Sequence, residues 1–156
     1  MTEDYSPVDP IEVTALPRLG LSPGVLLAVF VGGAIGTVSR FLLDSFHPTA
    51  SGHFPYATLI INLSGSLVIG LLIPVVETLH SRAPLARPFL VVGILGGWTT
   101  FSTLVVDADL LVRSGNLLVA LGYLVATLIG GVLLVVVGDA AGSRLATSME
   151  TRSAAE

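Results

Sequence analysis

The chain has 156 residues, of which 53% are apolar and 12% charged, and its formal net charge is −4. Soluble domains carry about 25% charged residues, so this composition predicts a protein that sits in a lipid bilayer. It excludes a disordered chain, a collagen-like fibre and a nucleic-acid binder, which would need a basic stripe. The sequence has no Cys, which excludes disulfides, thiolate chemistry and Cys-ligated metals.

Charged residues divide the chain into four uncharged windows, at 19–39, 45–76, 88–106 and 114–138. A helix needs about 20 residues to cross about 30 Å of hydrocarbon, so each window is long enough for one crossing. Strands of a membrane barrel would alternate over about ten residues, and these runs do not alternate. We therefore expect an all-α membrane protein with transmembrane helices at about 23–46, 56–79, 85–111 and 115–138.

The two ends of the chain are more polar than this four-helix unit, which we place at 23–142. Residues 1–22 are acidic and contain three prolines, whereas a secretory signal would begin with basic residues. We expect a disordered acidic tail there. Residues 143–156 are predicted to form a short polar tail.

Small residues four positions apart occur in three of the expected helices, as Gly32 and Gly36, Ser66 and Gly70, and Gly93 and Gly97. Such pairs let the backbones of neighbouring membrane helices approach closely. We interpret each pair, taken alone, as a helix-packing feature.

A few polar residues lie within the expected spans. The Asn62 amide needs a partner or water at membrane depth, and it forms either an interhelical hydrogen bond or a pore-lining donor. Arg40 is an intramembrane charge, which indicates function unless its side chain reaches the interface. Tyr123 and Thr127 share one helix face, although a lone Tyr is often interfacial and a lone Thr usually bonds its own backbone.

The strongest signal is the run from Gly93 to Leu104, which contains Gly96-Gly97 followed by Thr99, Thr100, Ser102 and Thr103. Such a stretch is a poor helix former. Irregular backbone at membrane depth is tolerated only where it is buried in protein or lines a wet cavity. We expect a broken third helix whose freed carbonyls are available to ions; the alternative is a kinked packing helix.

No residue pattern indicates an enzyme. His47, His53 and His80 lie in or near expected loops and have no ligand spacing. Asp107 and Asp109 lie near the end of a span, where we expect them to be solvated.

Three motifs together resemble the CrcB/Fluc fluoride channel family over residues 24–140. They are GGAIGTVSRF at 32–41, NLSGS at 62–66 and GGWTTFST at 96–103. The resemblance implies a four-helix subunit of an antiparallel dimer with two pores, which exports fluoride passively across the plasma membrane of a bacterium and relieves fluoride toxicity. It implies a structural Na⁺ at the dimer interface, held by the carbonyls of Gly96 and Thr99. The fluoride-pore residues that it implies are Arg40, Asn62, Phe101, Ser102, Tyr123 and Thr127.

Leu104 departs from the family pattern, which usually has a second Phe at this position. The edge of a Phe ring carries positive potential that can solvate an anion, and a Leu side chain does not. One alternative is therefore a non-conducting or weaker partner in a heterodimeric channel. A proton-coupled exporter of organic cations would need a membrane-embedded carboxylate, and no Asp or Glu lies in the expected helices away from their ends.

The arginines predict an orientation. The termini and the loop between the second and third helices carry five arginines, and the other side has Arg113 with the embedded Arg40. This bias favours cytoplasmic termini. Because an antiparallel dimer contains one inverted subunit, the partner is either the same chain with dual topology or an oppositely biased homologue.

Overall fold

The computed structural model describes residues 22–46 and 52–153, and these residues form helices joined by short turns, with no strand. The helices are α1 (Pro23–Phe46), α2 (Tyr56–Thr78), η1 (Arg87–Leu95), α3 (Gly96–Trp98), α4 (Ser102–Arg113) and α5 (Leu117–Ser153). Within this part of the chain four segments are long and apolar enough to cross a membrane, because η1, α3 and α4 follow one another in a single span. The prediction of an all-α protein with four spans is confirmed. The predicted acidic tail lies, apart from Ser22, outside the described residues.

The fourth helix extends well beyond its predicted end. We expected it to stop at 138 and a polar tail to begin at 143, but α5 continues without interruption to Ser153. Residues 143–153 are mostly good helix formers and contain no proline. Gly138 and Gly142 also pack against the backbone of Leu71 on α2, so tertiary contact supports the helix past the predicted end.

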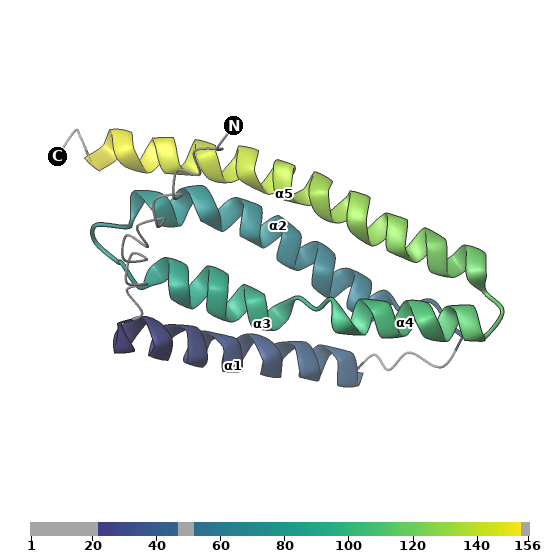
Figure 1. Ribbon diagram of the computed structural model, residues 1–156. Coiled ribbons are helices and arrows are strands. Elements are labelled where there is room, and N and C mark those ends of the chain that lie inside the picture. The colour runs from purple at the N-terminus through teal and green to yellow at the C-terminus, as the bar shows by residue number, and fades with distance from the viewer. Residues whose placement is uncertain (1–21, 47–51, 154–156) are drawn as a thin grey trace, which may run out of the picture.

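The spans pack mainly as two pairs of parallel helices. Figure 1 shows α1 running beside η1 and α3, and α2 running beside α5, while consecutive spans alternate in direction. In the first pair a Cβ atom built on Gly93 would lie 2.9 Å from Gly32 Cα, so only glycine allows this approach. In the second pair a Cβ atom on Gly70 would lie 2.9 Å from the backbone nitrogen of Asp139. The packing interpretation of the small-residue pairs is confirmed for these glycines.

The small buried core lies where α4 meets α5. Leu111 and Tyr123 are almost inaccessible there, and Ala108 and Ala120 pack beside them. Most other large apolar side chains face outward, and Phe30 and Leu118 are 75% and 83% exposed. An outer surface of this kind suits lipid or another subunit as its environment.

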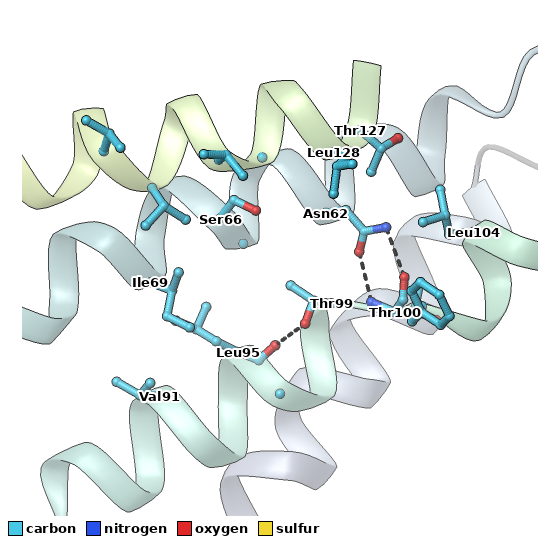
Figure 2. Close-up of a pocket in the computed structure, with 17 residues that line it drawn as sticks. Asn62, Ser66, Ile69, Val91, Leu95, Thr99, Thr100, Leu104, Thr127 and Leu128 are labelled. Atoms are coloured by element: carbon cyan, nitrogen blue, oxygen red, sulfur yellow. Dashed lines mark hydrogen bonds between the residues drawn. The ribbon is translucent and has the colours of Figure 1, made fainter. Parts of the chain in front are cut away.

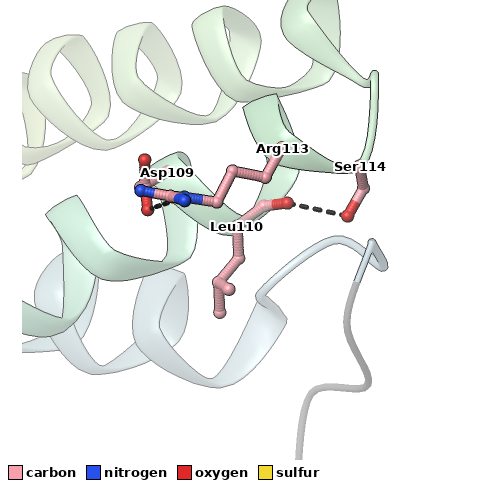
Figure 3. Close-up of polar contacts among 4 residues, drawn as sticks. All are labelled: Asp109, Leu110, Arg113 and Ser114. Atoms are coloured by element: carbon pink, nitrogen blue, oxygen red, sulfur yellow. Dashed lines mark hydrogen bonds and ion pairs between the residues drawn. The ribbon is translucent and has the colours of Figure 1, made fainter.

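The end of α4 is polar and solvated (Figure 3). Arg113 Nε donates to Asp109 Oδ2 at 2.6 Å, and both side chains are largely exposed. The Ser114 hydroxyl donates to the Leu110 carbonyl at 2.7 Å, and Gly115 turns the chain toward α5 with a φ of +80°. An exposed ion pair contributes at most about 1 kcal/mol, so this pair marks the end of the span rather than stabilising it. The expectation of a solvated Asp109 is confirmed.

The glycine contact between α1 and the η1–α3 segment generates a stability prediction. Gly36→Ala places a methyl group against the Ile94 carbonyl, which must move because it belongs to the backbone. We expect the unfolding free energy to fall by about 1–3 kcal/mol, as for other overpacked sites. Gly33→Ala is the matched control, since a Cβ atom there meets nothing within 4 Å. Thermal unfolding of the purified variants measures the difference, and equal melting temperatures would contradict the packing.

Candidate functional site

The third span leaves helical geometry between Trp98 and Ser102. Thr99 has φ −74° and ψ 155°, an extended conformation, and α4 begins three residues later. The Thr100 hydroxyl accepts the Thr103 N–H at 3.2 Å and so satisfies one of the free donors at the start of α4. The hydroxyl residues that disfavour a continuous helix therefore also stabilise the start of the next one.

Backbone carbonyls are left free where α3 ends. Among the described residues, no backbone N–H bonds to the carbonyls of Gly96, Gly97 or Thr99. The usual donor to Gly96 would be the Thr100 N–H, which instead donates to Asn62 Oδ1. Free carbonyls at a helix C-terminus carry partial negative charge, so this end can attract a cation. No cluster of His, Asp or Glu suited to a metal occurs in the described part of the chain.

Asn62 holds the break to α2 with two hydrogen bonds (Figure 2). Its Nδ2 donates to the Thr100 carbonyl at 2.9 Å, and its Oδ1 accepts the Thr100 N–H at 2.9 Å. This is the interhelical bond that was one of the two alternatives for Asn62. The amide nitrogen carries a second N–H, and the residue also lines the groove described next, so its donor capacity is not exhausted.

A groove of about 620 Å³ lies between α2, the η1–α3 segment and α5. Its walls are mostly aliphatic, with Ile69, Leu95, Val132 and Val135 among them. Polar groups lie along it from three elements: Asn62 and Ser66 on α2, Thr99 and Thr100 at the break, and Thr127 on α5. The groove is therefore apolar with a few directed donors and acceptors.

The structure brings some of the predicted site residues to this groove and leaves others away from it. The predicted pore residues Asn62, Phe101 and Thr127 line it, and so do both predicted sodium ligands, Gly96 and Thr99. The Phe101 ring is 77% exposed. Leu104 lines the groove as well and packs against the core beside Tyr123.

Ser102, Tyr123 and Arg40 are not among the groove-lining residues. Ser102 is exposed, with its hydroxyl 3.3 Å from that of Thr100. Arg40 is half-buried on α1. Tyr123 is fully buried in the core between α4 and α5, one turn from Thr127, whose hydroxyl donates to its carbonyl at 2.8 Å.

Tyr123 belongs to a polar cluster that joins three spans. Asp107 Oδ2 accepts the Thr58 hydroxyl at 2.6 Å and the Tyr123 hydroxyl at 3.4 Å, so α2, α4 and α5 meet at one carboxylate. The Phe54 ring packs edge-on against Tyr123 at a centroid distance of 5.6 Å. The expectation of a solvated Asp107 is wrong, because Asp107 is half-buried and bonded by both hydroxyls.

Thr58 and Asp107 were missed as site candidates for different reasons. Thr58 precedes Asn62 by four residues, so helical spacing places the two on one face of α2 and could have identified it. Asp107 gave no such signal, because it lies two residues before Asp109 and six before Arg113, near the charged end of the span. Only the pairing of α4 with α2 and α5 shows that the carboxylate points inward.

Comparison with known proteins gives a family match. The model of the CrcB-like proteins, described as Camphor Resistance (CrcB), matches residues 27–139. The protein named fluoride-specific ion channel FluC 2 from Nocardia farcinica is 42% identical over 132 residues, covering 85% of this chain and 94% of that protein.

Two further relatives carry similar names. Fluoride-specific ion channel FluC from Chloroflexus aurantiacus is 41% identical, over 75% of this chain and 94% of its own length. Fluoride-specific ion channel FluC 3 from Streptomyces avermitilis is 38% identical, over 88% of this chain and 67% of its own length. The family match includes all three motifs from the sequence and most of the four spans, and the chain therefore belongs to the CrcB family.

Proposed function

We propose that this chain is a subunit of a fluoride-selective channel that lets fluoride leave a bacterial cell passively and so relieves fluoride toxicity. The observation that carries this proposal is the close likeness to relatives named fluoride-specific ion channels, over most of the chain. The four apolar spans make the chain a multi-pass protein of the plasma membrane.

The chemistry of the groove is compatible with this function. Fluoride is small and strongly hydrated, so a pore must replace water with donors that bind the ion and still release it. The second N–H of Asn62 and the positive edge of the Phe101 ring can contribute to such a path. The Thr127 hydroxyl could join them only by turning its proton away from the Tyr123 carbonyl. Among the described groove-lining residues there is no Arg or Lys, a fixed cation that would retain the anion.

An antiparallel dimer would cover the open side of the groove. The lining is largely aliphatic, and Phe101 projects from the break with most of its ring uncovered. In such a dimer each pore would combine the polar residues of one subunit with the Phe101 ring of the other. Either a second copy of this chain or a homologous chain could take this position.

We also propose a structural Na⁺ at the dimer interface, held by the carbonyls of Gly96 and Thr99. Both residues line the groove, and their carbonyls receive no backbone hydrogen bond among the described residues. A bound cation there would offset the partial negative charge at the end of α3. Since carbonyls are hard oxygen ligands, this donor set fits an alkali cation.

The heterodimer remains a second candidate assembly. Leu104 lines the groove where the family usually has Phe, so each subunit would contribute one aromatic edge fewer. Names numbered 2 and 3 among the relatives suggest that some organisms carry several such proteins. A subunit that lacks the second Phe could then form a dimer with a homologue that has both Phe residues.

The first test of the channel is anion selectivity. Liposomes that contain the purified chain and are loaded with fluoride should release it within the assay, whereas liposomes loaded with chloride should retain their contents. The reason is that the groove offers a few fixed donors in apolar walls and no cationic side chain among its described lining residues. An anion-selective electrode measures both ions, and comparable chloride efflux would refute fluoride selectivity.

Asn62 should be required for this flux. Asn62→Ala removes the amide N–H that faces the groove, and at about 1.5 kcal/mol for a hydrogen bond to an anion we expect at least about a tenfold slower fluoride efflux. Asn62→Asp should also slow efflux, because a carboxylate still accepts the Thr100 N–H but cannot donate to the Thr100 carbonyl and presents negative charge to fluoride.

The control for the Asn62 variants is Asn116→Ala, which removes an amide that bonds the Gly52 carbonyl outside the groove. It should retain wild-type efflux. Unchanged efflux in Asn62→Asp would remove Asn62 from the fluoride path.

The orientation of the subunit distinguishes the two assemblies. The start of α1, the link between α2 and η1, and the end of α5 lie at the same end of the bundle, with Arg82, Arg87, Arg144 and Arg152 on these segments (Figure 1). The positive-inside rule then favours a cytoplasmic C-terminus. A reporter fused to that terminus should give cytoplasmic signal alone if a separate partner exists. Equal signal from both sides, together with fluoride efflux from the purified chain alone, would eliminate the heterodimer.

A further inference from the structure

The Trp98 indole, at the end of α3, is fixed by α2 within the same subunit. Its Nε1 donates to the Ser64 hydroxyl oxygen at 3.0 Å. That hydroxyl donates in turn to the Ile61 carbonyl at 3.0 Å, so its proton and one of its two lone pairs are used. Trp98 is half-buried. An indole N–H away from water needs such a partner, and the described bonds show Ser64 as the one that it has.

A recess on α2 receives the next residue of the break. A Cβ atom on Gly65 would lie 3.2 Å from Trp98 Cδ1 and still closer to the Thr99 methyl group, so the glycine leaves space for this corner of the chain. Asn62, Ser64 and Gly65 on α2 therefore contact three consecutive residues, Trp98–Thr100. The extended Thr99 is therefore held from both sides, by Trp98 before it and Thr100 after it.

The proposed Na⁺ ligands lie on either side of Trp98. Gly96 precedes the tryptophan within α3, and Thr99 follows it directly. The Trp98 Cα joins the end of α3 to Thr99, and the bond from the indole to the Ser64 hydroxyl restrains the position of this Cα. The Thr99 carbonyl belongs to the next peptide unit, whose N–H is held by Asn62. Neither a partner subunit nor an ion is needed to make these bonds.

We infer that Ser64 and Trp98 are positioning residues, whose hydrogen bond sets the direction of the Gly96 and Thr99 carbonyls before Na⁺ binds. This inference rests on the Na⁺ site in the proposed function. A preorganised site binds its ion more tightly because less ordering remains to be done at binding. Loss of the hydrogen bond should thus weaken Na⁺ binding while the ligands themselves stay unchanged.

Trp98 is the only tryptophan of the chain, so its fluorescence reports directly on this position. Titration of the full-length purified protein with Na⁺ should give a saturable fluorescence change. Ser64→Ala should raise the Na⁺ concentration at half-saturation about tenfold, and Ser64→Thr should restore most of the affinity because it keeps a hydroxyl. Thr78→Val is the matched control: it removes a hydroxyl on α2 that bonds a carbonyl three residues earlier, as Ser64 does, but holds no tryptophan.

A second variant keeps the test independent of how well Ser64→Ala folds. Trp98→Phe removes the indole N–H, and the rise in melting temperature with added Na⁺ replaces fluorescence as the measurement. Half of the maximal rise in melting temperature should require about the same increase in Na⁺ concentration in this variant as in Ser64→Ala. The Na⁺ concentration at half-maximal stabilisation should be no higher in the double variant than in either single variant, because both changes remove the same bond.

The possible failures can be distinguished. If the wild-type protein shows no response to Na⁺ in fluorescence or melting temperature, the Na⁺ site and this inference are both overturned, while fluoride efflux still tests the channel. If the wild type responds and both Ser64→Ala and Trp98→Phe keep its half-saturation within twofold, the Na⁺ site stands and the positioning role is overturned. Additive shifts in the double variant would also overturn it, because they would mean that the residues act separately.

Discussion

The rest of the structure depends on how the backbone of the third span is satisfied where its helix stops. In hydrocarbon an unpaired N–H or carbonyl is costly, so an interruption needs partners inside the protein. Asn62 supplies them by pairing with both polar groups of the Thr100 backbone. Diverting the Thr100 N–H to this side chain leaves the Gly96 carbonyl without its usual helical donor. The contact that stabilises the interruption is therefore also the one that makes carbonyls available to a ligand.

Close helix packing brings Asn62 within reach of the break. Glycines on α1 meet η1 and α3 backbone to backbone, and glycines on α2 and α5 do the same in the second pair of parallel helices. The groove forms where α2 and α5 face the η1–α3 segment. The Asp107 cluster fixes α4 to α2 and α5 on the far side of the break. Both halves of the interrupted span are thus attached to α2, which holds the site together.

The fold was largely predictable, and the misses have physical causes. Four uncharged windows bounded by charges predicted four spans, because the thickness of the bilayer sets their length. The end of α5 was missed, since polarity indicates where the membrane ends but not where a helix ends. Residues 143–153 favour helix by themselves, and Gly142 places them against α2. Asp107 was misjudged for a related reason, because nearness to a span end along the chain says nothing about which neighbour the side chain faces.

The sequence by itself determined that this protein sits in a lipid bilayer, that it has four spans, which family it belongs to and where the third span is interrupted. These features could be predicted because composition, window length and the GGWTTFST motif can be identified without knowing how the helices pack. The sequence left open whether Asn62 is a packing residue or a donor, and it gave no sign that Ser64 and Trp98 bond to each other. Tertiary structure alone showed that Asn62 bonds to Thr100 and that Trp98 bonds to Ser64. Residues 62 and 100, or 64 and 98, are far apart in the chain, and the close approach of α2 to the η1–α3 segment brings their polar atoms within hydrogen-bonding distance.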